Sequence, residues 1–252
     1  MPYDSNVYVH LLPAFIPAGS LPGGIAVVVD VLRATTAMVH ALHAGIEAII
    51  PCLEVNEARA IADSFPKGSV ILGGERQGLP IEGFDLGNSP MSYTPEICQG
   101  KTLVMTTTNG TRAIHASLDA ERILIAAFAN VQKTISILAA FAGPVHVVCA
   151  GTDGNVSLED TLLAGLMAHE LTGNQRPFGN DSSQIACGFW LDQEARFEGS
   201  NALADSIGRG RGGCRVKEIG LARDIEDAGR IDSFDFSAEL VRSQEPYRIV
   251  RI

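Results

Sequence analysis

The segment VVVDVLRATT (27–36) decides the fold class of this chain. It begins with the short aliphatic run of a buried parallel strand and continues through polar residues into a helical pattern. Two further segments repeat this order, VMTTTNGTR (104–112) and VVCAGTDGNVSLED (147–160). A fourth, LGGERQGLPIEGFDLGNSP (72–90), follows a strand pattern but is dense in glycine and charge. Because loops after parallel strands meet at one edge of an open sheet, where ligands bind, we expect the functional site there.

Outward from these segments, strand and helix patterns alternate along the chain. The predicted strands cover 7–12, 25–31, 46–53, 70–74, 101–107, 121–128 and 144–150. The predicted helices cover 35–44, 54–65, 111–117, 131–141 and 158–172. This alternation predicts a three-layer α/β fold, with a predominantly parallel sheet, right-handed crossovers and helices on both faces.

The composition changes near Gly173. Residues 173–183 are polar and indicate a loop or a junction, 183–194 and 200–207 look helical, and 208–220 is expected to be flexible and basic. We expect a single domain over 1–252, with a C-terminal subdomain from about residue 173 as the alternative. The basic cluster is interpreted as a solvated loop or part of a subunit contact in a homo-oligomer, rather than an anion site. Its members are Arg209, Arg211, Arg215 and Lys217.

Composition narrows the function classes. The 252 residues are 46% hydrophobic but only 6% aromatic, which favours an aliphatic interior. A formal net charge of −10 argues against a nucleic-acid or anionic-membrane surface, although loops can still bind a small anion. The N-terminus lacks a signal-peptide pattern, and no apolar run is long enough to span a bilayer. Five widely spaced cysteines suit reduced thiols, so we expect a cytoplasmic location.

The first loop offers a carboxylate and a guanidinium at the end of a strand. Asp30 ends a run of valines, where an isolated charge is costly unless it is paired or binds a metal. A salt bridge to Arg33 is the structural alternative to metal binding or catalysis. Thr35 and Thr36 offer hydroxyls at a helix start, which suits a phosphate, and Arg33 would supply a bidentate fork.

The second loop, 72–90, is too long for a simple connection and is expected to be functional. Glu75 and Arg76 are its strongest candidates because they follow the strand directly, and Asp85 and Asn88 come after them. Glu82 is balanced between a solvated charge and a functional one.

The third and fourth loops provide small hydrogen-bonding groups and two more carboxylates. Gly110 permits close approach of the backbone to a ligand, whereas Asn109 and Thr111 either bind phosphate or cap the next helix. For Glu159 and Asp160, helix capping and Mg²⁺ binding are equally supported interpretations.

Common cofactor signatures are absent from the sequence. It contains no GxxxxGK[ST], no GxGxxG after a strand, no GxSxG elbow and no HExxH. Oxygen ligands without clustered histidine or cysteine favour Mg²⁺ over zinc. The expected partner is therefore a small anionic phosphorylated substrate, with no nucleic acid and no membrane.

The motifs resemble one known family. VVVDVLRATTAMVHAL, LGGERQG, IEGFDLGNSP, MTTTNGTRAI and SLEDTLLAG together resemble the 2-phosphosulfolactate phosphatases of coenzyme M biosynthesis, in order over roughly residues 5–172. The resemblance implies an α/β phosphatase that uses Mg²⁺ to hydrolyse 2-phospho-3-sulfolactate to 3-sulfolactate and phosphate. The matching motif positions are Asp30, Arg33, Thr35, Glu75, Arg76, Asp85, Asn88, Asn109, Gly110, Thr111, Glu159 and Asp160.

Roles for these residues are assigned on physical grounds. The expected metal ligands come from five carboxylates, Asp30, Glu75, Asp85, Glu159 and Asp160. Arg33, Arg76 and the backbone amides of 109–111 would stabilise the transferring phosphoryl group. Direct water attack and an aspartyl-phosphate intermediate both stay open. Two other functions also stay open: hydrolysis of other 2-hydroxy acid phosphates, and a non-catalytic module that binds an anionic metabolite.

Overall fold

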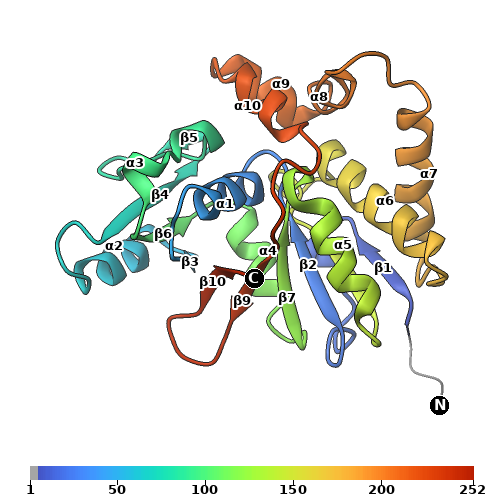
Figure 1. Ribbon diagram of the computed structural model, residues 1–252, viewed down its shortest axis with the longest axis horizontal. Helices are drawn as coiled ribbons and strands as arrows, with labels where there is room; N and C mark the ends of the chain where they lie inside the picture. Colours follow the sequence, from blue (N-terminus) through green and yellow to red (C-terminus); the bar gives the residue numbers. More distant parts are fainter. Residues whose placement is uncertain (1–4) are drawn as a thin grey trace.

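The protein is described by a computed structural model that places residues 5–252 (Figure 1). Residues 1–4, part of the N-terminal segment that lacks a signal-peptide pattern, lie outside the described residues. The strands are β1 (Val7–His10), β2 (Ile25–Val29), β3 (Ala48–Cys52), β4 (Val70–Arg76), β5 (Leu79–Pro80), β6 (Thr102–Thr106), β7 (Arg122–Ala126), β8 (Val145–Cys149), β9 (Ala238–Val241) and β10 (Arg248–Arg251).

Ten α-helices and three short 3₁₀ turns connect these strands in the described part of the chain. The helices are α1 (Ala34–His43), α2 (Val55–Asp63), α3 (Pro95–Cys98), α4 (Gly110–Ala116), α5 (Val131–Ala140), α6 (Leu158–Gly173), α7 (Asp181–Glu194), α8 (Ala202–Ile207), α9 (Arg211–Glu218) and α10 (Ala222–Ala228). The 3₁₀ turns are η1 (Pro13–Phe15), η2 (Pro90–Ser92) and η3 (Phe128–Asn130). These elements confirm the α/β class and most of the predicted strands and helices.

The sheet consists of two parallel blocks joined by an antiparallel hairpin. Its order is β1-β8-β2-β7-β9-β10-β3-β6-β4-β5. β1, β8, β2 and β7 pair in parallel, as do β3, β6 and β4. Between the blocks, β9 pairs antiparallel with β7, and β10 pairs antiparallel with both β9 and β3. Three successive antiparallel pairings mean that the two blocks run in opposite directions.

This geometry changes how the four loops meet. The helices that follow β2 and β6, α1 and α4, contact each other at the junction of the blocks, and α4 contacts both β2 and β3 (Figure 1). The loops after β2 and β8 therefore approach from one block, and those after β4 and β6 approach from the other. The expectation of one shared edge of a parallel sheet is wrong, because the hairpin reverses the second block.

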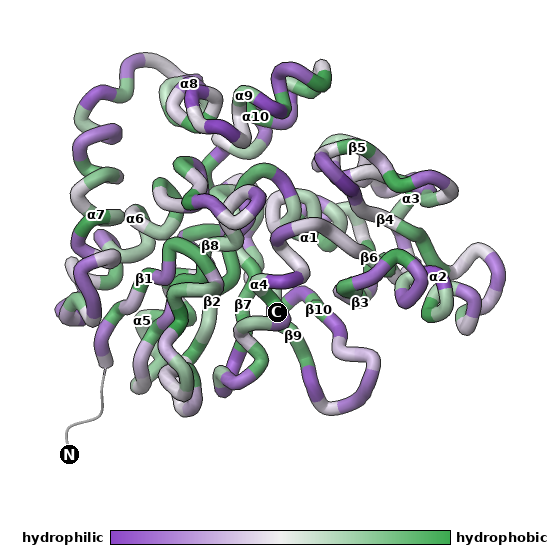
Figure 2. The backbone as a smooth tube through the Cα atoms, turned by 180° about the vertical axis from the view of Figure 1, so that it is seen from behind, coloured by the Kyte–Doolittle hydropathy of each residue, from purple (hydrophilic) through white to green (hydrophobic). Residues whose placement is uncertain are grey.

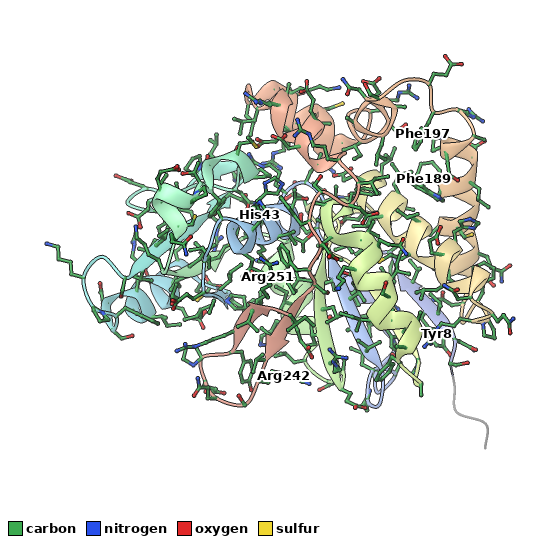
Figure 3. All side chains as sticks on the ribbon, in the orientation of Figure 1. Tyr8, His43, Phe189, Phe197, Arg242 and Arg251 are labelled. Carbon is green, nitrogen blue, oxygen red and sulfur yellow. The ribbon has the colours of Figure 1, made fainter. Side chains whose placement is uncertain are left out.

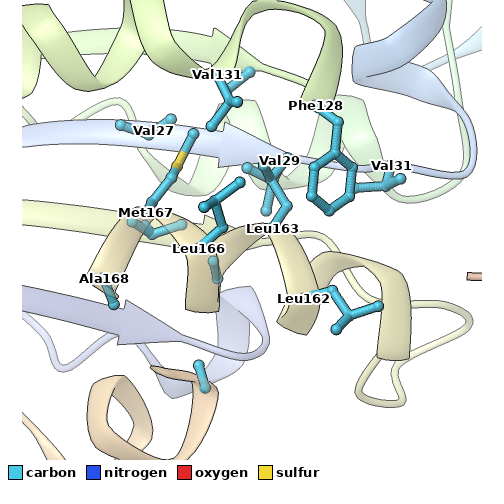
Figure 4. Close-up of a cluster of buried hydrophobic side chains, with 14 of the residues drawn as sticks. Val27, Val29, Val31, Phe128, Val131, Leu162, Leu163, Leu166, Met167 and Ala168 are labelled. Carbon is cyan, nitrogen blue, oxygen red and sulfur yellow. The ribbon is translucent and has the colours of Figure 1, made fainter. Parts of the chain in front are cut away.

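The hydrophobic core explains why β2 reads as an unbroken apolar run. All five of its residues are fully buried, because helices cover both faces of the sheet. Val27 and Val29 pack in one core with Phe128 of η3 and with Leu163 and Met167 of α6 (Figure 4). The alternate β2 residues belong to a second core that includes α1 and α4. Hydropathy along the backbone follows the same division, with hydrophobic strands inside (Figure 2).

The C-terminal hairpin was not predicted from the sequence. Arg242, just after β9, donates hydrogen bonds to the backbone carbonyls of Leu118, Ala120 and Glu121. Arg251 of β10 lies over the ring of Phe236, 4.5 Å from its centroid (Figure 3). The Arg242 bonds tie the hairpin to the segment before β7, and strand pairing joins it to both blocks, so residues 238–251 are part of the central sheet.

The segment 208–220 differs from its expected flexibility. It contains the two-turn helix α9, and Arg211 and Arg215 on this helix lie near the carboxylate of Asp153. Figure 1 shows α8, α9 and α10 together at the top of the view, above α1 and α6. Within residues 5–252, no helix combines the length and apolar character required to cross a bilayer.

Candidate active site

A small pocket lies where the four loops meet α9. Five of the residues predicted from sequence line it, namely Asp30, Arg33, Glu75, Asn88 and Asn109. Residues that were not predicted complete the wall, among them Thr108, Thr152, Asp153, Gly212 and Arg215. The pocket is therefore built from both parallel blocks and closed by the C-terminal helices.

Asp30 is held at the start of α1, directly after β2. Its Oδ1 accepts a hydrogen bond from the amide of Ala34 at 3.3 Å. The hydroxyl of Thr35 accepts from the Asp30 amide at 2.9 Å and donates to the Asp30 carbonyl at 3.0 Å. A methyl group placed on Gly110, the first residue of α4, would lie 2.9 Å from Asp30 Oδ2. Glycine at 110 thus leaves room for this carboxylate between the two helix starts.

The charge state of Asp30 is unusual. Burial, with a smaller contribution from the nearby carboxylates of Glu75 and Glu159, raises the pKa of Asp30 to about 7. The Ala34 amide and the Arg33 guanidinium oppose this rise in pKa but do not cancel it. A carboxylate with a strongly shifted pKa in a pocket is a typical feature of a functional site.

Glu75 joins the loops of the second block. Its Oε2 accepts from the amide of Gly78 at 2.7 Å, and its Oε1 accepts from the amide of Thr108 at 2.7 Å. The side chain is buried and lines the pocket. Glu75 therefore fixes the β4–β5 turn against the loop after β6 and contributes negative charge to the pocket.

Arg33 forms hydrogen bonds with other residues of the protein. Its Nη1 donates to Oδ2 of Asp224 at 2.8 Å, and its Nη2 donates to the carbonyl of Gly78 at 2.7 Å. Ser89 donates to the other oxygen of Asp224 at 2.6 Å. The structural alternative for Asp30, a salt bridge to Arg33, is not found among the described residues, because Arg33 pairs with Asp224 of α10.

Glu159 and Asp160 begin α6 and are almost fully buried. Asp160 accepts from the Val31 amide at 2.8 Å and from the Gly151 amide at 3.0 Å, so it ties the β2 loop to the β8 loop. Burial raises the pKa of Asp160 well above its usual range, and Asp30 and Glu159 add to this effect. Ser157 accepts from the Asp160 amide and is the N-cap of the helix.

Glu159 differs from Asp160 because neither of its carboxylate oxygens has a partner in hydrogen-bonding geometry among the described residues. Burial raises the pKa of Glu159, and the Ser157 hydroxyl nearby lowers it in part. The carboxylate lies directly behind α9, since a methyl group on Gly212 would be 2.0 Å from its Oε1. Gly212 itself lines the pocket, so Glu159 is separated from it by a single backbone.

Further unsatisfied polar atoms surround the same pocket. Asn88 Oδ1 and Thr108 Oγ1 are buried without a hydrogen-bond partner among the described residues. Buried polar atoms without partners are uncommon in native proteins, where a bound ion, water or substrate often satisfies them. They give the pocket two oxygen atoms that are available to a ligand, and the unpartnered carboxylate of Glu159 lies next to the pocket, behind Gly212.

The remaining predicted residues serve other contacts. Arg76 donates to the carbonyls of Glu75 and Leu53 and to the Thr106 hydroxyl, and it does not line the pocket. Asp85 is exposed and accepts from the Leu72 amide, which pins its loop to β4.

The two buried threonines at the helix starts are bonded to backbone. Thr36 donates to the Val31 carbonyl, and Thr111 donates to the Thr107 carbonyl. Thr111 also borders a separate cavity between α4 and the β9–β10 hairpin. The rings of His40 and His43 pack against the ring of Phe234, and His43 is labelled in Figure 3.

Sequence reasoning missed the contribution of the last helices. Asp224 and Arg215 lie in GGCRVKEIGLARDI (212–225), a segment in which no site residue was predicted. Basic and apolar residues recur in this segment at helical spacing, which would have predicted a helix. The glycines that precede them favoured a flexible loop instead.

The donors suit a hard cation. The Asp30 carboxylate lines the pocket, and the oxygens of Glu159 and Asn88 Oδ1 have no partner among the described residues. All of these are oxygen ligands, which Mg²⁺ prefers. In the described part of the chain, no three His, Cys, Asp or Glu side chains are grouped closely enough to hold a metal alone. Mg²⁺ at this pocket would therefore need water and substrate phosphate to complete its coordination.

Comparison with known proteins identifies the family. The sequence profile described as 2-phosphosulpholactate phosphatase matches residues 10–242, a range that contains the whole pocket. The chain belongs to the 2-phosphosulfolactate phosphatase family. By this membership it is an enzyme, a phosphoric monoester hydrolase.

Curated relatives of this family match most of the chain, and each is named probable 2-phosphosulfolactate phosphatase. A relative from Caldanaerobacter subterraneus subsp. tengcongensis is 36% identical over 214 residues, 85% of this chain and 86% of the relative. One from Symbiobacterium thermophilum is 38% identical over 210 residues, 83% and 88% of the two chains. One from Synechococcus sp. is 42% identical over 174 residues, 68% and 71%.

Proposed function

We propose that the protein hydrolyses 2-phospho-3-sulfolactate to 3-sulfolactate and inorganic phosphate, with Mg²⁺, as a cytoplasmic step of coenzyme M biosynthesis. The supporting observation is the group of buried, unpartnered oxygen atoms around Asp30, in a family match that contains the entire pocket. A site of this kind has donors ready for a cation and a phosphorylated ligand.

Charge balance supports the metal. The substrate carries a phosphate, a sulfonate and a carboxylate, whereas Asp30, Glu75 and Asp153 already make the pocket wall acidic. Mg²⁺ bound through Asp30 and Glu159 would neutralise part of this charge and polarise the phosphoryl group. Such a cation would also give the unpartnered oxygens of Glu159 the partner that they lack.

The protein's own groups would position the reaction. Glu75 holds the β4–β5 turn and the loop after β6 at fixed spacing, so the amides near Asn109 can face the phosphoryl oxygens. Asp30 would either orient the attacking water or attack the phosphorus itself. In both cases the P–O bond to the substrate C2 oxygen breaks, and water supplies the oxygen and the protons of the products.

Hydrolysis of other 2-hydroxy acid phosphates is the alternative within the same class. It would use the same pocket and differ only in the group that lies beside the phosphate. A non-catalytic anion-binding module is disfavoured, because it would not require the acidic groups that surround this pocket.

A substrate panel tests the proposal. The purified protein is incubated with 2-phosphosulfolactate, 2-phospholactate and phenyl phosphate, with Mg²⁺ or with EDTA, and phosphate release is measured. We expect the fastest release from 2-phosphosulfolactate and none after chelation. Full activity in EDTA would contradict the metal role, and faster release from 2-phospholactate would favour the alternative substrate class.

A further inference from the structure

Two guanidinium groups line the pocket, those of Arg33 and Arg215, and they differ in burial and in hydrogen bonding. Arg33 is buried, and two of its nitrogen atoms bond to Asp224 and to the Gly78 carbonyl. Its positive charge is largely balanced by Asp224, which lies 2.8 Å away. Arg33 therefore shapes the wall of the pocket and retains little charge for an anionic ligand.

Arg215 of α9 is placed differently. Its Nη1 donates to Asp153 Oδ2 at 3.0 Å, and its other donors have no partner among the described residues. The side chain is 34% exposed and lines the same pocket as Asp30 and Asn109. A methyl group on Gly78 would lie 3.7 Å from Arg215 Nε, so the guanidinium stands across the β4–β5 turn from Arg33.

The proposed substrate needs a second cation. A metal at Asp30 and Glu159 would serve the phosphate, but the sulfonate and the carboxylate on the adjoining carbons would remain uncompensated. Within the described residues that line the pocket, Arg33 and Arg215 supply the positive side chains. Arg33 is buried against Asp224, whereas Arg215 is partly exposed and has only one bonded nitrogen. A guanidinium fork binds a carboxylate or a sulfonate through two parallel hydrogen bonds.

We propose that Arg215 determines substrate specificity by binding the anionic group that lies beside the phosphate ester. The inference rests on the proposed phosphatase function and adds to it a residue outside the four strand-end loops. Asp153 would hold the guanidinium at the pocket rim through one nitrogen while the other donors face the ligand.

The test compares Arg215→Met and Arg215→Lys with a matched control, Arg211→Met. Arg211 is on the same helix, also faces Asp153 at 3.8 Å, is 65% exposed and does not line the pocket. The measured quantity is kcat/KM for 2-phosphosulfolactate divided by kcat/KM for phenyl phosphate, with Mg²⁺ present. Thermal denaturation checks that each variant is folded.

We expect this ratio to fall about ten- to a hundredfold in Arg215→Met, which corresponds to the loss of one charge-assisted pair. Arg215→Lys should lie between, because it keeps the charge but loses the fork. Measurements with 2-phospholactate separate the two anionic groups. An equal loss on this substrate assigns Arg215 to the carboxylate, and a loss confined to 2-phosphosulfolactate assigns it to the sulfonate.

An unchanged ratio in Arg215→Met, or the same change in Arg211→Met, would overturn the inference. Calorimetric titration with 3-sulfolactate separates this outcome from failure of the proposed function. If the wild-type protein releases no phosphate but binds 3-sulfolactate, and Arg215→Met weakens binding tenfold or more, the inference stands without the phosphatase activity. If the wild-type protein neither hydrolyses the substrate nor binds 3-sulfolactate, both are wrong.

Discussion

Arg33 and Asp224 are 191 positions apart in the chain, yet they form a buried ion pair 2.8 Å long at the wall of the pocket. Each side chain is 4% exposed. Asp224 also accepts from Ser89, and Arg33 also donates to the Gly78 carbonyl. One pair thus connects α1, the β4–β5 turn, the loop before η2 and α10.

Replacing Asp224 by Asn should strongly destabilise the fold. The charge of Arg33 would stay buried without its counter-ion, which costs about 3–5 kcal/mol of unfolding free energy. Urea denaturation measures this loss. Asp235→Asn is the control, because Asp235 is 94% exposed and pairs with Lys133 at 3.6 Å, so its removal should cost about 0–1 kcal/mol. Equal losses in the two variants would show that the buried pair has no special weight.

Asp30→Asn should reduce turnover and increase stability together. Loss of this charge next to the substrate should lower kcat at least about a hundredfold. The folded pKa of Asp30 is raised to about 7, so its favourable contribution is complete below about pH 4 and is lost as pH rises through 7. In EDTA, the variant should therefore exceed the wild type in unfolding free energy by roughly 1–4 kcal/mol at pH 8, and by much less at pH 5.

Phosphate release and urea denaturation at both pH values check this prediction. Asp63→Asn on the exposed face of α2 is the control and should change neither quantity. Wild-type turnover in folded Asp30→Asn would remove Asp30 from the catalytic groups.

Glu159→Gln should weaken the response to Mg²⁺. Both of its carboxylate oxygens lack partners among the described residues, so its charge is the one most available to a cation. We expect the Mg²⁺ concentration for half-maximal activity to rise about tenfold or more. Asp85→Asn is the matched control, since the Asp85 carboxylate is exposed and bonds to the Leu72 amide outside the pocket. If the Mg²⁺ requirement rose in Asp85→Asn but not in Glu159→Gln, Asp85 and not Glu159 would be the metal ligand.

Gly212→Ala should lower activity, whereas Gly188→Ala should raise the stability of the protein. A methyl group on Gly212 would lie 2.0 Å from Glu159 Oε1, so the Glu159 carboxylate or the α9 backbone at the pocket wall must shift. We expect kcat/KM to fall roughly tenfold or more, because displacements of about 1 Å near a site have effects of this size. Gly188 on α7 has open space around it, and alanine there should stabilise the protein by about 0.5–1 kcal/mol. Thermal denaturation and steady-state kinetics on both variants test the contrast.

The sequence predicted the α/β class and the strand-end position of Asp30 and Glu75, because buried strands leave a local apolar signal that ends where the polar loop begins. It did not predict the hairpin β9–β10. Its strands have four residues each and their hydrogen bonds to the two blocks reach partners more than a hundred positions away, so no local pattern reveals them.

The roles of individual side chains were harder to predict than their positions. Arg33 follows β2 and Arg76 is the last residue of β4, but the structure directs one to Asp224 and the other to the Leu53 carbonyl. Partner choice depends on the tertiary arrangement of α10 and β3, which spacing within one loop does not encode. The basic residues of α9 were interpreted as part of a solvated loop or a subunit contact for the same reason.

The hairpin has a consequence for the order of folding. Chains leave the ribosome N-terminus first, so β7 and β3 are made long before residues 238–251, which pair with both of them. Until the hairpin β9–β10 pairs with them, β7 and β3 are free edge strands of the two blocks, at what becomes the middle of the sheet. Unpaired edges invite pairing with other chains. A protein cut short before residue 238 should therefore accumulate as aggregates, even though it retains every residue of the pocket.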